Sequence, residues 1–516
     1  MPFRLLLLFA IPVQLLFANV ADQYLSKNRE LFFNKLVNEI ESSHVFLDQN
    51  RTKAFSWKGS LPKIKKMFKE AKTKTDVYYA ILALQRNLKN NHSSLRMPGE
   101  FYEFDMRSRS LPFRLQYTGT NYEVSISEHT KVKSGLVLKS IDEKPISQIE
   151  EELLLWHGSS SLDHFRQEFS RLLTRPTAWK QPIPKGESVK LEFVDSKTGA
   201  ATKISIPWSK YDLKSEYPEE TSCGDTLTHD KDYKSYKVTY VGINYCIYQS
   251  SLKNTLLVRF FSFNYYLREK SLQKRLSLIS PEHKKGLSVG SRPSELERKD
   301  LKHLTEQVNK AGKSNLLIDI RENRGGNINP ELLSALAKKQ YKILERKFVF
   351  TKFTRNNQDY LKNALDHGGE KMRALILEDF KDKKKKESRM FPFYCKTKKC
   401  NLKEKYYTPF SSLKYDKLYI LSGPQCLSSC DQFVSVIKDN RLGTILGLPS
   451  QGSHAPFRAK KTFSLANGQT FTFQVVNGVG YRANGKILEG NPPQPDFKFY
   501  FNSNGLKKAE TIISGQ

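Results

Sequence analysis

Apolar positions recur at different periods along the chain, and each period predicts a different secondary structure. Between residues 22 and about 100, apolar side chains recur every three or four positions, which is typical of amphipathic helices. From about 101 to 215, short segments alternate apolar and polar positions, which predicts strands. These predicted strands are 111–117, 122–126, 189–193 and 203–206, with a helical stretch at 162–173 between them.

From about residue 236 onward, strand-like and helical patterns alternate. Residues 256–263 and 316–320 read as strands, and residues 301–311 and 433–438 read as helices. Such alternation predicts a layered α/β core. At about 150 residues per domain, 516 residues suggest about three domains. The prediction is therefore a multidomain α/β protein.

The predicted domains follow these changes in pattern. They are an N-terminal helical region at 22–100, a β-rich domain at 101–215 and an α/β core at 216–516. Two stretches of the core look like insertions. Residues 265–300 are polar and basic with Gly and Pro, and residues 354–405 carry charge runs and two cysteines.

The N-terminus predicts export. Arg4 precedes an apolar run at 5–17, and the small residues Ala18 and Ala21 follow it. This order is typical of a cleavable secretory signal peptide, here residues 1–21. The run is shorter than the roughly 20 apolar residues that a membrane span needs. An uncleaved anchor is the alternative, and the expected location is periplasmic or extracellular.

Six cysteines fit an oxidising compartment, where an even number favours disulfides. Proximity in the sequence suggests the pairs Cys223–Cys246, Cys395–Cys400 and Cys426–Cys430. The competing idea is a zinc site from the last four. Their spacings, C-x4-C and C-x3-C, are not a common zinc pattern, so we expect no metal.

The charge is strongly basic, with 85 Lys+Arg against 53 Asp+Glu and a formal net charge of +32. A 38% share of hydrophobic residues excludes a disordered chain. The charge favours contacts with anionic polymers, such as those of a cell envelope. The chain lacks a basic module interleaved with aromatic residues, so no specific nucleic-acid partner is expected. The sequence does not set the oligomeric state.

Three separated segments carry candidate chemistry. In the first, Asp319 directly follows an apolar run, and Gly325 and Gly326 come a few residues later. A double glycine at the end of a buried strand permits a sharp turn and brings bare N–H groups close to a ligand. An ordinary strand-to-helix turn is the alternative reading.

The second and third segments hold a serine and a histidine. Ser428 lies at the start of a predicted helix, where the helix dipole favours developing negative charge. Ser428 and Asp431 also have the spacing of a capping box, which needs no chemistry. His92 lies in a polar loop after an amphipathic helix and is a candidate general base, although it also fits a surface residue.

Taken in order, these segments resemble the tail-specific (carboxy-terminal-processing) and tricorn-type serine peptidases. The resemblance runs from about residue 75 to 500, apart from the insertions. Its motifs are residues 88–95, 135–146, 319–326, 428–431, 444–447 with Gly452, and 488–496. The resemblance implies a crotonase-like layered peptidase core, preceded by the helical region that carries the histidine and by a PDZ-like domain.

The resemblance also implies roles for individual residues. Ser428 would be the nucleophile and His92 its base. Glu489 would orient the imidazole and stabilise its charge, and a relay through another hydroxyl is the alternative. Backbone N–H groups of Gly325 or Gly326 and of Ser429 would form the oxyanion hole. The implied activity is that of an exported serine endopeptidase acting on peptides or unfolded proteins, with no cofactor and no metal.

The chain departs from the family pattern in several places. Tail-specific members use a lysine about 25 residues after the serine, but Ser453 stands there, which favours the His-based branch. His454 is an alternative base, and Ser429 is an alternative nucleophile. A disulfide between Cys426 and Cys430 would clamp the nucleophile turn.

The PDZ-like segment departs from the pattern too. Glu143 replaces the usual Gly after Asp142, and no Gly-Leu-Gly-Phe carboxylate loop is visible, which leaves the binding of substrate C-termini open. Two other functions compete with the peptidase. One is a catalytically inactive, peptidase-fold binding protein, and the other is a basic protein that binds envelope polymers.

Overall fold

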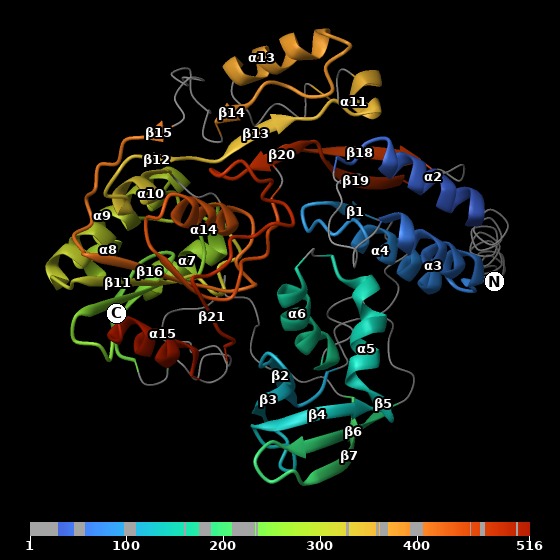
Figure 1. Cartoon of the computed structure of the whole chain (residues 1–516), viewed down its shortest axis with the longest axis horizontal. Coiled ribbons are helices and arrows are strands. Elements are labelled where there is room, and N and C mark those ends of the chain that lie inside the picture. The colour runs from blue at the N-terminus through green and yellow to red at the C-terminus, as the bar shows by residue number, and fades with distance from the viewer. Residues whose placement is uncertain are drawn as a thin grey trace, which may run out of the picture.

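The computed structural model shows a multidomain α/β protein, as predicted (Figure 1). It describes residues 29–45, 57–96, 110–158, 161–174, 187–208, 233, 236–326, 330–357, 361, 370–392, 406–454, 456–464, 470–501 and 504–516. The predicted signal peptide lies outside the described residues, as do Cys223, Cys395 and Cys400. No helix in the described part of the chain is long and apolar enough to cross a membrane.

A seven-stranded sheet forms the centre of the largest unit. Its order is β21 (Phe497–Lys498), β17 (Thr444–Gly447), β16 (Lys417–Ser422), β11 (Asn315–Asp319), β10 (Thr255–Phe260), β9 (Tyr245–Gln249) and β8 (Val238–Val241). The strands from β21 to β10 run parallel, and β9 and β8 continue the sheet antiparallel. Because β11 and β16 are parallel neighbours, the segments after them emerge at the same edge of the sheet.

Helices cover both faces of this sheet. One face packs against α9 (Pro293–Ala311), α10 (Pro330–Leu336) and α14 (Ser429–Asp439), and the other against α15 (Gly505–Ser514). Alternate residues of one strand serve the two faces: Leu316 and Ile318 lie in the first core and Leu317 in the second. Parallel strands buried on both sides explain the near-continuous apolar runs of the sequence.

The stretch 265–300 is an integral part of this unit. It forms α7 (Glu269–Leu278), α8 (Pro281–Lys284) and the start of α9, around a small core that includes Tyr265, Leu272 and Leu276. Asp300 lies 2.9 Å from the ring of His283 and accepts the backbone N–H groups of residues 243 and 244. This buried network joins the stretch to the loop between β8 and β9.

The N-terminal region contains α2 (Arg29–Glu41), α3 (Trp57–Glu70) and α4 (Lys74–Arg86), followed by β1 (Ser94–Arg96). The sequence pattern predicted only helices here, so β1 is a correction. This strand exists because Leu95 pairs with Phe473 of β19 (Thr470–Val476), which continues to β18 (Arg458–Ser464). The pairing attaches the N-terminal helices to the C-terminal part of the chain.

The β-rich unit has an antiparallel sheet of order β2-β3-β4-β6-β7, with β5 beside β4. Its strands are β2 (Phe113–Tyr117), β3 (Tyr122–Ser127), β4 (Leu136–Ile141), β5 (Lys144–Pro145), β6 (Ser188–Asp195) and β7 (Ala201–Pro207). Between β5 and β6 the chain forms α5 (Ile146–Leu153), the short η3 (Leu154–Trp156) and α6 (Leu162–Thr174). Figure 1 shows α6 between the small sheet and the rest of the molecule.

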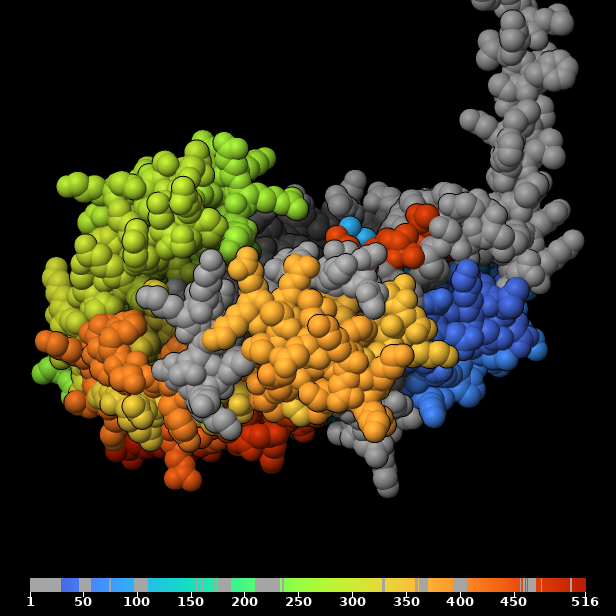
Figure 2. All heavy atoms as spheres, turned by 90° about the horizontal axis from the view of Figure 1, so that it is seen from above, coloured from blue at the N-terminus to red at the C-terminus, as the bar shows by residue number. Residues whose placement is uncertain are grey.

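A last unit lies over the N-terminal helices and the core. It contains α11 (Lys352–Asn356), α13 (Glu370–Lys381) and the sheet β14 (Phe391–Pro392), β13 (Glu345–Phe348), β20 (Gly478–Tyr481). The two-stranded sheet of β12 (Tyr341–Lys342) and β15 (Tyr406–Tyr407) lies beside it. Phe353 donates its N–H to Ser42 O, and Figure 2 shows this unit (yellow to orange) next to the blue N-terminal helices.

Candidate active site

Ser428 lies in a tight turn between β16 and α14. Its backbone has φ 61° and ψ −117°, a combination that residues with a side chain rarely adopt and that costs about 1–3 kcal/mol. A serine on a strained strand-to-helix turn is the arrangement that exposes nucleophiles in several hydrolase folds. Ser428 is half-buried, whereas Ser429 is only 3% exposed. The accessible hydroxyl of the pair is therefore that of Ser428.

His92 reaches this hydroxyl from the N-terminal region. Its Nε2 lies 3.1 Å from Ser428 Oγ, within hydrogen-bond distance. The loop around His92 is held on two sides. Asn90 Oδ1 accepts the N–H groups of His92 and Ser93, and Gln474 Nε2 of β19 donates to His92 O. The β1–β19 pairing thus places a base beside a serine that is distant in the sequence.

Ser453 occupies the other side of the imidazole. Its Oγ lies 3.2 Å from His92 Nδ1. If Nε2 accepts the proton of Ser428, Nδ1 must carry the ring hydrogen, and Ser453 Oγ is its acceptor. The sequence places Ser453 where tail-specific members have their lysine, but it gave no role to this hydroxyl. The place of Ser453 at the family's lysine position is the one sequence feature that could have indicated its role.

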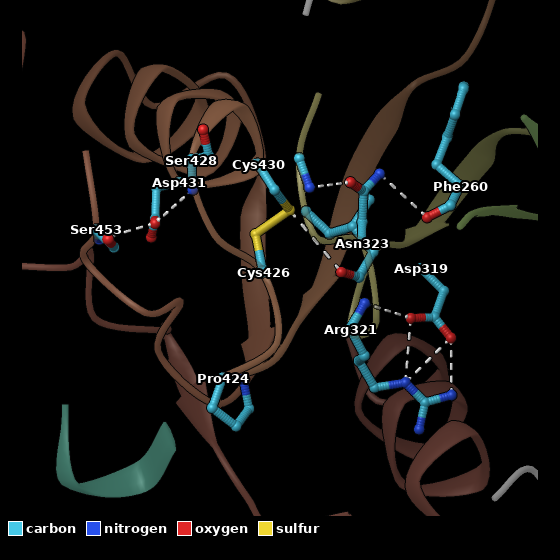
Figure 3. The surroundings of a disulfide bond; sticks show 12 residues. Phe260, Asp319, Arg321, Asn323, Pro424, Cys426, Ser428, Cys430, Asp431 and Ser453 are labelled. Atoms are coloured by element: carbon cyan, nitrogen blue, oxygen red, sulfur yellow. Dashed lines mark hydrogen bonds and ion pairs between the residues drawn. A yellow bond between two sulfur atoms is a disulfide. The ribbon is translucent and has the colours of Figure 1, made fainter. Parts of the chain in front are cut away.

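Asp431 ties the serine turn to the segment that carries Ser453. Its carboxylate accepts the N–H groups of Ser428 (3.1 Å), Gly452 (2.8 Å) and Ser453 (3.0 Å), and Figure 3 shows it between the two serines. Burial raises the pKa of Asp431 to about 7, although these N–H groups favour its ionised form. Asp431 accepts the N–H of Ser428, as the capping-box alternative predicts. The hydroxyl of Ser428 also lies beside His92, so the capping contact and the candidate chemistry occur together.

Two further predicted residues lie elsewhere in the network. Glu489 Oε2 accepts the N–H of His454 at 2.6 Å, so the carboxylate holds the backbone next to Ser453. The residue facing His92 Nδ1 is Ser453, a hydroxyl, and the resemblance had left a relay through another hydroxyl open beside a direct role of Glu489. His454, the alternative base, has its Nδ1 3.1 Å from Gln432 Nε2 and packs its ring against Gly480. The structure brings His92, and not His454, to the hydroxyl of Ser428.

The double glycine lies against the serine turn, and its two N–H groups differ. Gly325 donates its N–H to Asn323 Oδ1, and Asn323 Nδ2 donates to Phe260 O (Figure 3). The N–H of Gly325 is therefore already engaged. Within the described part of the chain, the Gly326 N–H donates no backbone hydrogen bond. Ser429 is the first residue of α14, so its N–H has no partner within the helix.

Asp319 and Arg321, which precede the double glycine, form a buried ion pair. Arg321 Nη2 lies 2.7 Å from Asp319 Oδ2, and the hydroxyl of Tyr233 donates to the same oxygen at 2.6 Å. Burial alone would raise the pKa of Asp319, but the Arg321 guanidinium outweighs it and holds the pKa below its usual value. This buried pair fixes the end of β11, from which the double glycine extends.

Cys426 and Cys430 form a disulfide that spans the serine turn (Figure 3). The predicted pair is thus present, and the alternative of a zinc site from the last four cysteines is wrong, because two of these sulfurs are bonded to each other. Cys246 is disulfide-bonded too. No group of three His, Cys, Asp or Glu side chains within the described residues could hold a metal ion.

Replacing Gly325 with alanine should disable this site. A Cβ there would lie 2.4 Å from Leu427 O and 3.0 Å from Ser429 N, and the φ of +87° strains any side chain. We expect a loss of about 10²–10³-fold in rate, the usual cost of a lost oxyanion donor, because the clash would displace the N–H of Ser429. Gly485 is the matched control because it has φ +85° with nothing within 4 Å. Equal rates for Gly325→Ala and Gly485→Ala would contradict the expectation.

Comparisons with known proteins concern the family and the fold of the chain. Residues 288–499 match the model of peptidase family S41, a region that includes Ser428 and the double glycine but not His92. No curated protein matches the chain. The solved structure of mature CPAF complexed with lactacystin has a TM-score of 0.66 at 14% identity, over 95% of this chain and 99% of that chain. This likeness shows a shared fold.

Two other solved structures overlap less well. The photosystem II D1 C-terminal processing protease has a TM-score of 0.37 at 10% identity, over 93% of this chain and 96% of that chain. The tricorn protease has a TM-score of 0.34 at 12% identity, over 95% of this chain and 36% of that chain. The family match over residues 288–499 covers less than half of the chain, and it identifies this segment as a serine-type peptidase region of family S41.

Proposed function

We propose that the chain is an exported endopeptidase that cleaves peptides or unfolded proteins, with Ser428 as nucleophile and His92 as base. The observation that carries the proposal is the 3.1 Å contact between His92 Nε2 and Ser428 Oγ. A serine hydroxyl is a weak nucleophile until an adjacent base takes its proton, and the contact meets this need. The strained backbone of Ser428 and its half-buried side chain support the same role.

The reaction begins with proton transfer. His92 Nε2 takes the proton of Ser428 as Oγ attacks the scissile carbonyl carbon, and the carbonyl oxygen becomes an oxyanion. The N–H groups of Gly326 and Ser429 are the donors proposed for this oxyanion, because that of Gly325 is engaged by Asn323. Donors fixed before the reaction stabilise the developing charge without reorganisation.

The same imidazole completes the cycle. Protonated His92 gives its proton to the leaving amine, and the acyl group stays on Ser428. A water molecule then loses its proton to His92 and attacks the ester, which releases the second product and restores the serine. No metal or cofactor enters these steps.

Ser453 holds the imidazole in the productive orientation. Its Oγ accepts the Nδ1 hydrogen of His92, which keeps Nε2 free to act as base. Asp431 fixes the backbone of Ser453, and Glu489 fixes that of the next residue. Glu489 thus acts on the imidazole indirectly, through the chain around Ser453.

Two further features belong to this proposal. Disulfides persist mainly in oxidising compartments, so the Cys426–Cys430 bond and the paired Cys246 support export to the periplasm or the medium. The small antiparallel sheet with α5 and α6 supports a PDZ-like domain, and the layered seven-stranded unit supports a crotonase-like core.

Digestion of an unfolded protein tests the function directly. We expect the purified protein to cut reduced, alkylated casein at internal bonds, because the carbonyl is attacked in the middle of an extended chain. Mass spectrometry of early products should show large fragments with new termini on both sides. Release of single terminal residues only, or no cleavage, would contradict an endopeptidase.

A further inference from the structure

The β-rich unit contacts both chain segments that carry the proposed catalytic pair. The contacts come from residues 154–158 and from residues 161–168, which include the first half of α6. We call these residues the interdomain strut. The strut contacts the loop of His92 at one end and the turn before Ser428 at the other.

At the histidine end, the contact is made by Lys89, three residues before His92. Its side chain is buried, with 4% of the residue exposed, and Nζ donates to Leu154 O at 3.0 Å and His157 O at 2.6 Å. Gly158 packs closely here too, since a Cβ on it would lie 2.8 Å from Asn91 Oδ1. Burial, together with the nearby charge of Arg86, lowers the pKa of Lys89 to about 7.

At the serine end, two residues one turn apart on α6 contact the turn before the disulfide. His164 Nδ1 lies 2.5 Å from Pro424 O, and Glu168 Oε1 accepts Gln425 Nε2 at 2.7 Å. A carbonyl oxygen only accepts, so Nδ1 carries the hydrogen. Gln425 directly precedes Cys426, whose disulfide to Cys430 encloses Ser428. A shift of α6 would therefore be passed on to the disulfide-closed turn that holds Ser428.

The strut is itself anchored. Phe165 and Phe169 of α6 lie in the core of the β-rich unit, so His164 and Glu168 project from a helix that is fixed on its neighbouring face. The rings of His157 and His164 lie 5.3 Å apart and join the two ends. Tyr500, after β21, donates to Asp163 at 3.0 Å and adds a second attachment to the peptidase core.

We propose that the interdomain strut positions His92 relative to Ser428, with Lys89, His164 and Glu168 as positioning residues. The two reacting side chains come from segments 336 residues apart, and the strut contacts both segments. Reaction rates depend steeply on such alignment, and a misplacement of 1 Å can cost about 10²-fold. The effect on catalysis rests on the proposed function. The structural link between the His92 and Ser428 segments through the strut does not depend on that function.

The test uses the full-length exported protein and single substitutions in the strut contacts. Lys89→Met keeps the chain length and removes the donors, and Glu168→Ala removes the acceptor of Gln425. We expect kcat to fall about 10-fold to 100-fold, with KM changed less than about threefold, because alignment and not substrate binding is lost. Glu168→Gln keeps an oxygen acceptor and should hold kcat within about threefold of wild type.

Matched controls come from exposed residues of the same unit. Lys139→Met on β4 and Glu151→Ala on α5 remove the same groups away from the strut and should leave kcat unchanged. Hydrogen exchange gives a second measurement that needs no activity. Residues 88–95 and 424–430 should both exchange faster in Lys89→Met and in Glu168→Ala, with melting temperatures showing folded protein.

The outcomes separate this inference from the proposed function. Faster exchange in both segments together with reduced kcat supports the strut. Faster exchange in a protein whose wild type cleaves nothing supports the structural coupling and rejects the peptidase mechanism. Unchanged exchange in 424–430 for the Lys89 variant, or kcat values equal to those of the controls, overturns the strut.

Discussion

Replacement of Ser428 by alanine should abolish hydrolysis of an unfolded protein substrate. The proposed mechanism has one nucleophile, and losing it in comparable enzymes lowers kcat by on the order of 10⁴- to 10⁶-fold. The fold should survive, because the turn is held by the Cys426–Cys430 disulfide and by the backbone bond from residue 428 to Asp431. Casein digestion measures the activity, and thermal unfolding measures the stability.

Ser429→Ala is the control for this substitution. Its side chain is buried, and alanine keeps its backbone N–H, so activity within about threefold of wild type is expected. Activity retained by Ser428→Ala and lost by Ser429→Ala would mean that the neighbouring serine is the nucleophile. Activity retained by both would place the chemistry at another site.

Replacement of His92 by alanine should lower kcat nearly as far as the Ser428 substitution does. Without the imidazole, nothing takes the serine proton, and residues that act as one unit do not have additive effects. The Ser428→Ala/His92→Ala double variant should therefore be no worse than either single variant within a small factor. Initial rates of casein cleavage at saturating substrate measure this.

A histidine outside the site provides the control for His92. His129 lies in the loop between β3 and β4, and its ring nitrogen accepts the N–H of Lys131. His129→Ala should keep wild-type rates. A His92→Ala protein with normal rates would remove His92 from the mechanism, and the alternative base His454 would then need testing in the same way.

Ser428 and His92 could be predicted as site residues because each lies in a short segment that is recognisable from its own sequence. The order of the segments indicated that they belong together. The glycine pair could be predicted for the same reason. Their distance could not, since it depends on the pairing of Leu95 with Phe473 across the fold.

The partners of these residues were harder to predict. Ser453 faces His92 because Asp431 fixes the backbone of residues 452 and 453, which is a tertiary contact without a sequence motif. Glu489 was expected to orient the imidazole, directly or through another hydroxyl, and its carboxylate binds the N–H of His454, next to Ser453. Gly325 or Gly326 was expected as a donor to the oxyanion, and Asn323 engages the N–H of Gly325.

For secondary structure too, elements set by the local sequence were predictable, and those set by tertiary contacts were not. The buried parallel strands β11 and β16 and the helices α9 and α14 follow from apolar runs and helical spacing, which are properties of the local sequence. Strand β1 has three residues and is formed through its partner β19, so no local pattern distinguishes it from a loop. The stretch 265–300 looked like an insertion by composition, and its sparse apolar residues pack into a small core with Ile243 of the β8–β9 loop.

The most direct test of the central claim is covalent labelling of the intact protein with a fluorophosphonate, followed by peptide mapping. Such reagents react with serines that a neighbouring base has activated. The catalytic pair predicts a single adduct on Ser428 in the wild type, and no adduct at that position when His92 is alanine. An unlabelled protein, or one labelled at full rate without His92, would contradict it.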